Sequence, residues 1–221
     1  MWLNSKNRPV ERLSASGLPL ARRLWLWRLI WRIAAAFLAA TGLVVLLFGY
    51  TAKISPPVSV EPAVTVFVIR DQMHRGIVLP LPAGYVEFGF GSFEWYARAK
   101  DRWYHAMATV LSPNQGTLSR REHHVTDAAA LQSSMPAVTL LPLAVSGKLA
   151  DALRARLQAQ FDDSAALAVY RTGMQMQFVP WARDYWFADN CNHAIVQWCA
   201  ELGCTATSVP LLLDVELAAP K

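Results

Sequence analysis

The amino-acid sequence predicts an α+β domain preceded by one membrane-spanning helix. Three observations support this. Residues 33–52 contain no charged side chain, the segments that follow residue 63 are rich in β-branched residues and alternate with a period of two, and two later segments repeat apolar residues at helical spacing. The 221 residues suffice for one globular domain and an appendage.

The positive charge of the chain is concentrated at its N-terminus. Of the first 32 residues, seven are Lys or Arg and only Glu11 is acidic, whereas the rest carries 14 basic and 15 acidic residues. The formal net charge of +5 therefore comes from a basic leader, residues 1–32. It gives no indication of nucleic-acid binding, because the remaining domain is close to neutral.

The uncharged stretch IAAAFLAATGLVVLLFGYTA, residues 33–52, is long enough to span a membrane. At about 1.5 Å per residue, a helix of this length crosses a hydrocarbon core of roughly 30 Å. The basic leader before it, with only Lys53 just after it, predicts a cytoplasmic N-terminus. A cleaved signal peptide is the alternative. The long basic region favours a signal anchor, which places the chain in the bacterial cytoplasmic membrane as a single-pass protein with an extracytoplasmic C-terminal domain.

The remaining residues are predicted to form a proline-rich linker, 53–62, and one domain, 63–221. An N-cap at Ser146 predicts a helix over 147–161, and the apolar stripe of the last cysteine-containing segment predicts another. The other expected elements are strands at 65–70, 74–81, 85–91 and 137–143, strand or extended structure within 166–180, a helix over 95–111 and a loop at 112–116.

All three cysteines lie in DNCNHAIVQWCAELGC, residues 189–204. The stripe of Ala194, Ile195, Trp198, Cys199 and Leu202 predicts a helix that Cys191 opens and that ends near Gly203. About 12 Å of helix then separates Cys191 from Cys199, too far for a disulfide. Cys199 and Cys204 could pair if the chain reverses at Gly203; otherwise Cys199 is a buried apolar residue. The spacing matches no common zinc pattern, so neither a metal nor a cofactor is predicted.

Cys191 is the candidate nucleophile. A thiol at a helix N-terminus lies at the positive end of the helix dipole, which favours the thiolate, although a small buried residue is the alternative interpretation. A nucleophile also requires a base, and His74 opens a predicted strand in DQMHRGIVLP. The Cys191 backbone N–H, at the helix start, is then positioned to bind a developing oxyanion.

Three motifs in this order resemble the permuted NlpC-type papain-like superfamily. They are MHRGIVLP, VEFGFGS and DNCNHAIVQW. The resemblance is nearest to a bacterial family of unknown function that is often found near urease genes, and it covers about residues 63–204. It implies a papain-like fold with Cys191 and His74 as neighbours. Met73 replaces the usual aromatic residue, and Ser92 stands where an acid is expected.

The residue that would orient His74 is predicted from the hairpin between the second and third strands. A three-residue turn at 82–84 pairs His74 with Ser92. The same register places Glu87 roughly 16 Å along the strand and on the other face. Ser92, with Glu94 nearby, is therefore preferred over Glu87 as the third catalytic residue.

The remaining histidines have less specific interpretations. The sequence predicts a solvated surface for His123 and His124, which adjoin charged residues, and it favours a solvent-facing His193.

Together these features predict a membrane-anchored, extracytoplasmic cysteine amidase or peptidase, with cell-wall (peptidoglycan) peptides as the substrate that the compartment suggests. The first alternative is acyl transfer or thioester cleavage on lipids, for which Trp95, Tyr96, Trp103 and Tyr104 could provide an interfacial surface. The second is a catalytically degenerate binding or assembly module, in agreement with the neutral Ser92.

Overall fold

The computed structural model describes residues 20–48, 52–58, 61–71, 74–100, 102–207 and 215–218. The chain divides into two compact units, Met1–Val45 and Leu46–Lys221. Most of the predicted basic leader and Met73 lie outside the described residues.

The first unit is built on helix α1, Leu20–Phe48. Within it, Leu24–Val45 is long and apolar enough to cross a membrane. Its large side chains are exposed, with Phe37 and Leu38 at 70% and 69%, as lipid contact requires. The predicted spanning helix is confirmed to this extent. The helix begins earlier than the predicted residue 33, since Ala, Leu and Arg all have high helix propensity.

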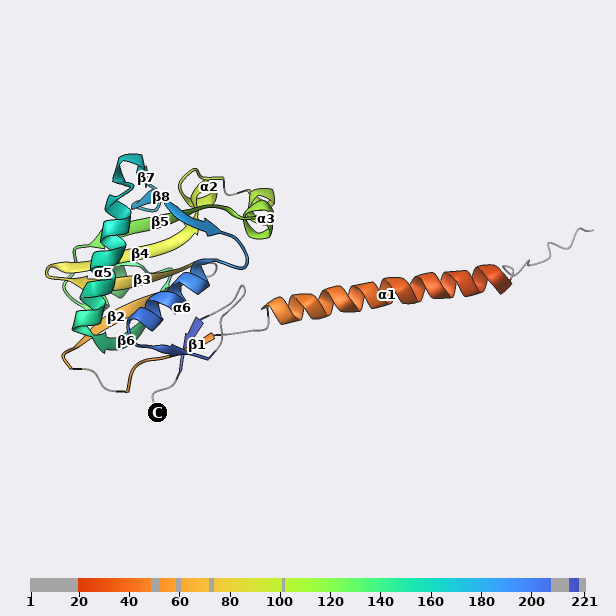
Figure 1. Cartoon of the computed structure of the whole chain (residues 1–221), viewed down its shortest axis with the longest axis horizontal. Helices are drawn as coiled ribbons and strands as arrows, with labels where there is room; N and C mark the ends of the chain where they lie inside the picture. The colour runs from red at the N-terminus through yellow and green to blue at the C-terminus, as the bar shows by residue number, and fades with distance from the viewer. Residues whose placement is uncertain are drawn as a thin grey trace, which may run out of the picture. The chain divides into compact units, whose positions relative to one another are not determined.

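The second unit is organised around a seven-stranded antiparallel sheet, so the α+β class is confirmed (Figure 1). The strand order is β6-β2-β3-β4-β5-β8-β7. The bounds are β2 Ala63–Arg70, β3 Arg75–Leu81, β4 Gly84–Ser92, β5 Asn114–His123, β6 Thr139–Ser146, β7 Val169–Arg171 and β8 Met176–Tyr185.

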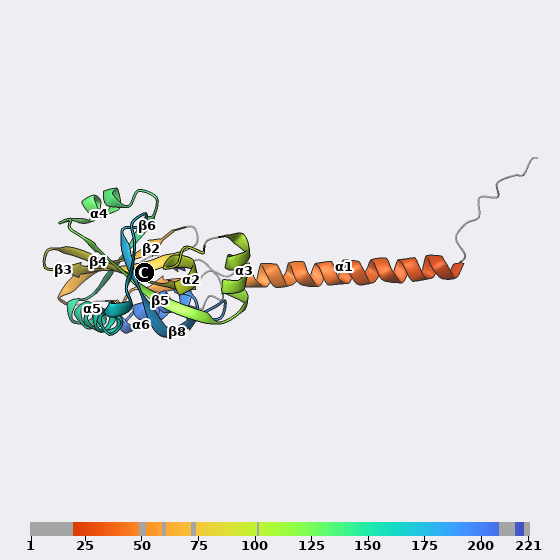
Figure 2. The ribbon, with the colours of Figure 1, turned by 90° about the horizontal axis from the view of Figure 1, so that it is seen from above.

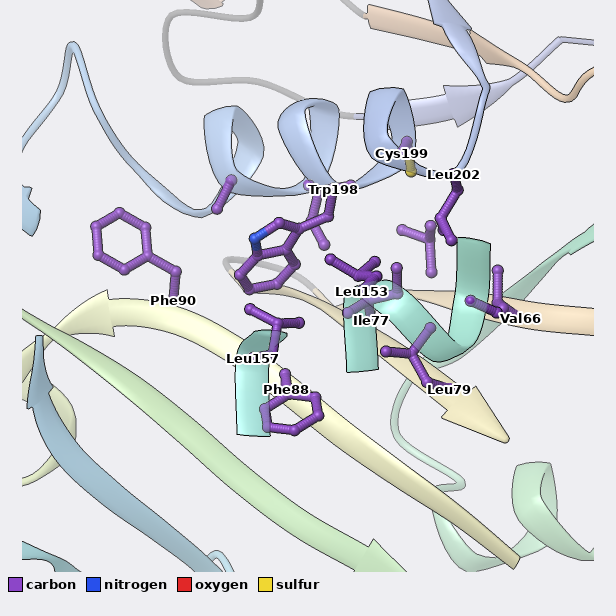
Figure 3. Close-up of a cluster of buried hydrophobic side chains, with 14 of the residues drawn as sticks. Val66, Ile77, Leu79, Phe88, Phe90, Leu153, Leu157, Trp198, Cys199 and Leu202 are labelled. Carbon is purple, nitrogen blue, oxygen red and sulfur yellow. The ribbon is translucent and has the colours of Figure 1, made fainter. Parts of the chain in front are cut away.

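Helices cover both faces of this sheet (Figure 2). Helices α5, Gly147–Asp162, and α6, Cys191–Glu201, pack on one face, and α4, Ala128–Ser134, lies on the other. Ser146 is the N-cap of α5, as predicted. The main core lies under α5 and α6, where fully buried Trp198 points from α6 toward Leu157 of α5 and the strand that carries Phe88 (Figure 3).

The β3–β4 hairpin differs from the predicted register by one residue. Leu81 pairs with Gly84 and Pro80 with Tyr85, so the turn has two residues, Pro82 and Ala83, instead of three. Gly84 adopts a positive φ of 123°, where a side chain would be strained, and this allows the tighter turn. The predicted pairing of His74 with Ser92 is therefore wrong, and the face assignment that followed from it changes.

A second, three-stranded sheet has the order β10-β1-β9. Its strands are β1 Ala52–Ser55, β9 Thr205–Ala206 and β10 Val215–Leu217. Ala52 and Ile54 are fully buried, and Ile54 belongs to the main core. Residues 53–55, predicted as linker, thus belong to the folded domain, because their strand partners come from the distant C-terminal part of the chain.

Two further segments depart from prediction. The expected helix over 95–111 is divided into α2, Phe93–Tyr96, and α3, Trp103–Leu111, and Ala99 between them has a φ of 56°. Strand β5 begins at Asn114, within the segment that was predicted as a loop, 112–116. A short 3₁₀ helix, Ala165–Leu167, precedes β7.

Candidate functional site

Cys191 is the first residue of α6, as the sequence predicts. Asn190 is the N-cap, and its side chain accepts a hydrogen bond from the Asn192 backbone N–H at 2.9 Å. His193 completes a capping box, since its Nδ1 accepts from the Asn190 N–H at 3.3 Å. His193 is therefore half-buried in a structural role, in contrast to the predicted solvent-facing position.

The loop before α6 is fixed by an ion pair. The Arg183 guanidinium, which lies over the Phe90 ring at 4.8 Å, donates through Nε to Asp189 Oδ2 at 2.8 Å and through Nη2 to Asp189 Oδ1. Because such two-pronged contacts define both distance and orientation, they hold the chain that delivers Cys191 to the end of the sheet.

Polar groups near Cys191 favour its charged form. The backbone N–H groups of Arg75 and Asn192, the Arg75 charge and the Tyr185 hydroxyl all act to lower the pKa of the thiol. The Cys191 backbone N–H acts in turn to lower the pKa of the Tyr185 hydroxyl. Arg75 directly follows His74 in the sequence, so α6 brings the thiol against the chain at the start of β3.

Burial works against the thiolate form of Cys191. Burial raises the pKa of Cys191 above its ordinary value, although the Arg75 N–H, the Arg75 charge and the Tyr185 hydroxyl oppose this shift. The side chain is only 5% exposed. The predicted lowering of the pKa by the helix dipole is thus outweighed by loss of hydration, which disfavours the charged form.

His74 lies directly before β3, as predicted. A Cβ placed on Gly89 of β4 would meet His74 Nε2 and Ser119 Oγ, each at 2.7 Å. The imidazole therefore lies over the Gly89 backbone, beside the Ser119 hydroxyl, and only glycine leaves room for it. Among the described residues, the buried Nδ1 has no hydrogen-bond partner.

Glu87 lies on the same face of the sheet as the His74 imidazole. Glu87 and Gly89 are two residues apart in β4, so both side-chain directions point to one side. Burial lowers the pKa of His74, and the negative charge of Glu87 is the largest influence that opposes this lowering. The prediction that Glu87 lies on the other face is therefore wrong, because it depended on the three-residue turn.

Glu87 is held as a carboxylate by two strand β5 side chains. Arg121 donates through Nε at 2.9 Å and through Nη2 at 2.6 Å, and His123 Nε2 donates at 2.9 Å, all to Oε2. Burial alone would raise the pKa of Glu87, but these partners outweigh it and the pKa lies below its ordinary value. His123 is only 8% exposed, so its predicted solvated position is wrong; His124 is exposed.

The two residues preferred by sequence have other partners. Ser92 is fully buried, donates to Asn114 Oδ1 at 2.6 Å and caps α2 by accepting from the Trp95 N–H at 3.4 Å. Glu94 forms ion pairs with Arg98 and Lys100. Neither interaction involves His74. Glu87 and Asp71 are the acids whose charges raise the pKa of His74, and Glu87 has the larger effect.

Tyr96 packs beside His74. Its ring lies 5.2 Å from the His74 ring and stacks on Phe178 at 6.2 Å. Burial raises the pKa of the Tyr96 hydroxyl, and the nearby Cys191 raises it further. Tyr96 is therefore part of the site, and not of the exposed aromatic surface considered for lipid binding. Tyr104 is 44% exposed.

Sequence reasoning overlooked Arg75, Tyr96 and Tyr185. The chain offered weak signals for them. Arg75 adjoins His74, and Tyr185 ends the strand six residues before Cys191. Their contribution depends on three elements meeting at one end of the sheet, which local patterns do not reveal.

Replacing Tyr185 by phenylalanine is expected to move Cys191 alkylation to higher pH. The change removes the hydroxyl that donates to the sulfur, so the already raised pKa of the thiol rises further. The measurement is the rate of iodoacetamide modification of Cys191 against pH, by mass spectrometry. Tyr170→Phe, at a side chain that is 58% exposed, is the matched control and should leave the profile unchanged. An unchanged profile in Tyr185→Phe would mean that the hydroxyl does not act on the thiol.

Comparison with protein-family models, with curated proteins and with solved structures gave no match. The chemistry of the site is consequently inferred from its own residues.

Proposed function

We propose that this protein is a membrane-anchored, extracytoplasmic cysteine amidase or peptidase of papain-like fold that acts on cell-wall peptides. The proposal rests on the polar groups that surround the Cys191 thiol. Three polar groups act to lower the pKa of the thiol at the start of α6: the Tyr185 hydroxyl and the backbone N–H groups of Asn192 and of Arg75, the residue that follows His74. A buried structural cysteine requires no such donors, because it packs as a small apolar residue.

In the proposed reaction, Cys191 and His74 begin as a neutral pair. As the sulfur attacks the substrate carbonyl, the Nδ1 of His74, which is hydrogen-bonded to none of the described residues, accepts the thiol proton in the manner of general-base catalysis. The imidazolium that forms is stabilised by the Glu87 carboxylate on the same face of the sheet. His74 then protonates the leaving amine, and water releases the acyl group from Cys191.

The developing oxyanion is expected to bind at the Cys191 backbone N–H. This N–H acts to lower the pKa of the Tyr185 hydroxyl, which places the two groups close together. When a carbonyl oxygen takes its place, the Tyr185 O–H can turn to donate to the same oxygen, as an oxyanion site requires. Tyr185 would thus act in both states, on the thiol before attack and on the oxyanion after it.

The proposal is tested by incubating the purified full chain in detergent with defined cell-wall peptides and separating the products by mass spectrometry. New amide cleavage that depends on Cys191 is expected. Because burial lowers the pKa of His74, the base stays neutral below pH 6.5, and the rate should hold into mildly acidic buffer before it falls. A rate that is already lost between pH 7 and 6 would contradict a neutral His74, and absence of cleavage across a peptide panel would contradict the activity.

Acyl transfer or thioester cleavage on lipids is the second candidate. It is favoured by exposed apolar side chains of α3, Tyr104 and Leu111, of which Leu111 is 67% exposed. The same attack by Cys191 on an ester or thioester carbonyl would leave a fatty acyl group on the sulfur. Intact-mass analysis of the chain isolated from membranes separates the two candidates, because only lipid chemistry adds a fatty acyl mass at Cys191.

A further inference from the structure

The other two cysteines meet at the C-terminal end of α6. The Cys204 N–H donates to the Cys199 carbonyl at 2.9 Å, and the Gly203 N–H donates to the Ala200 carbonyl at 3.0 Å. Gly203 has a φ of 83°. An outer hydrogen bond from residue 204 to residue 199, an inner one from residue 203 to residue 200, and a glycine in the left-handed conformation together form a Schellman motif.

In that motif the side chains at the two ends of the outer bond contact each other, usually through apolar groups. Here both positions are cysteine. Cys199 is 1% exposed and Cys204 is 7% exposed, both are free thiols, and both belong to the main core. Each of the two thiols alters the pKa of the other, in agreement with neighbouring side chains.

We propose that Cys199 and Cys204 are a redox-active dithiol, which an exogenous disulfide converts to an intramolecular disulfide across the C-terminal cap of α6. Because the Schellman turn places the two side chains next to each other, the proposed disulfide links neighbouring groups and not distant segments. The physiological direction of this reaction rests on the proposed extracytoplasmic location, because such compartments favour disulfides.

The exchange proceeds in two balanced steps. Cys204, the more accessible of the two, attacks the exogenous disulfide as a thiolate, forms a mixed disulfide and releases one thiolate. The neighbouring Cys199 thiol lowers the pKa of Cys204, which favours this attacker. Cys199 then loses its proton, attacks the Cys204 sulfur and expels the second thiolate. The dithiol gives up two protons and two electrons, and the exogenous disulfide is reduced to two thiols.

Oxidation would have two consequences for this chain. It would tie the end of α6 to β9, which begins at Thr205 and pairs with β1 through Ile54 and Ala206. It would also leave Cys191 as the one thiol of the chain, since the sequence contains three cysteines. The nucleophile would then be protected from pairing with either of its neighbours.

The test counts thiols in the full chain in detergent, after equilibration with oxidised glutathione. The protein is then unfolded in excess N-ethylmaleimide and weighed. We expect one maleimide on the wild type, located at Cys191, and three after prior reduction. Cys191→Ser should take up none when oxidised and two when reduced, and fragmentation should place the link between residues 199 and 204. Oxidation is also expected to raise the Tm by roughly 5 °C, and a Cys199→Ser/Cys204→Ser variant should show no such rise.

Three maleimides on the oxidised wild type, a lasting glutathione adduct at Cys204, or a link that involves Cys191 would overturn the proposal. The thiol count of the wild type needs no variant, so a folding failure of the double variant leaves the result decisive. Failure here is distinguishable from failure of the proposed activity, because Cys191-dependent cleavage is measured on the reduced protein.

Discussion

Replacing Cys191 by alanine is expected to lower the rate of cell-wall peptide cleavage by about 10⁴-fold or more. The nucleophile is lost, and a nearby water lacks the position and the reactivity of the sulfur. The fold should persist, because alanine fills most of the volume of a cysteine at a helix start whose capping interactions come from Asn190 and His193. The measurement is the initial rate of product formation, alongside circular dichroism of both proteins.

The matched control is Cys204→Ala, the same substitution at the other end of α6, where the side chain is also buried. This variant should retain cleavage, since Cys204 contacts Cys199 and not the site. If Cys191→Ala cleaves at a rate near that of the wild type, the protein is a binding or assembly module, or a contaminating enzyme produces the cleavage.

Replacing Glu87 by alanine is expected to destabilise the domain by about 3–5 kcal/mol. Glu87 is 3% exposed and accepts hydrogen bonds from Arg121 and His123, so its removal leaves a largely buried guanidinium without its counter-charge. Urea unfolding followed by tryptophan fluorescence measures this loss. Glu94→Ala, which breaks only partly exposed ion pairs, should cost less than about 1 kcal/mol.

The milder Glu87→Gln substitution separates the catalytic role from the structural one. Without the carboxylate charge that acts to raise it, the pKa of His74 should fall further, so the acid limb of the rate profile should shift to lower pH. The maximal rate should also fall, because imidazolium is less stabilised. A shift in Glu94→Gln, with none in Glu87→Gln, would restore the residue preferred by sequence and contradict the geometry.

The same carboxylate predicts how stability depends on pH. The pKa of Glu87 is lower in the folded chain than its ordinary value of 4.5. A carboxylate of this kind contributes its full stabilisation above the unfolded pKa and loses it as the pH falls through the lower folded value. Wild-type stability should therefore drop in this acid window, and the drop should be smaller in Glu87→Gln.

Much of the arrangement could be predicted from the sequence, where patterns are local. The apolar N-terminal helix, the helix α5 with its N-cap Ser146 and the start of α6 at Cys191 were confirmed because period and capping residues determine them within a few turns. His74 directly before β3 was confirmed for the same reason. The papain-like resemblance stays a prediction.

The errors have a common physical cause, which is dependence on distant partners. Strand β5, NQGTLSRREH, is polar, yet it lies inside the sheet between β4 and β8. Its Arg121 and His123 side chains donate hydrogen bonds to the Glu87 carboxylate of β4, which offsets the cost of burying them. Strand β1 has only four residues, and it forms because it pairs with β9 and β10 from the C-terminal part of the chain. A one-residue error in a single turn was enough to place Glu87 on the wrong face of the sheet relative to His74. Burial, which local sequence does not measure, reversed the expected pKa shift of Cys191.

The central claim, that Cys191 and His74 act as one nucleophile–base pair, is tested most directly by a double-mutant cycle on the cleavage rate. Rates are measured for the wild type, Cys191→Ala, His74→Ala and the double variant. Residues that act as a unit are strongly non-additive, so the double variant should be no slower than Cys191→Ala alone. A double variant whose rate loss equals the product of the two single losses would show that the residues act independently, and would contradict the pair.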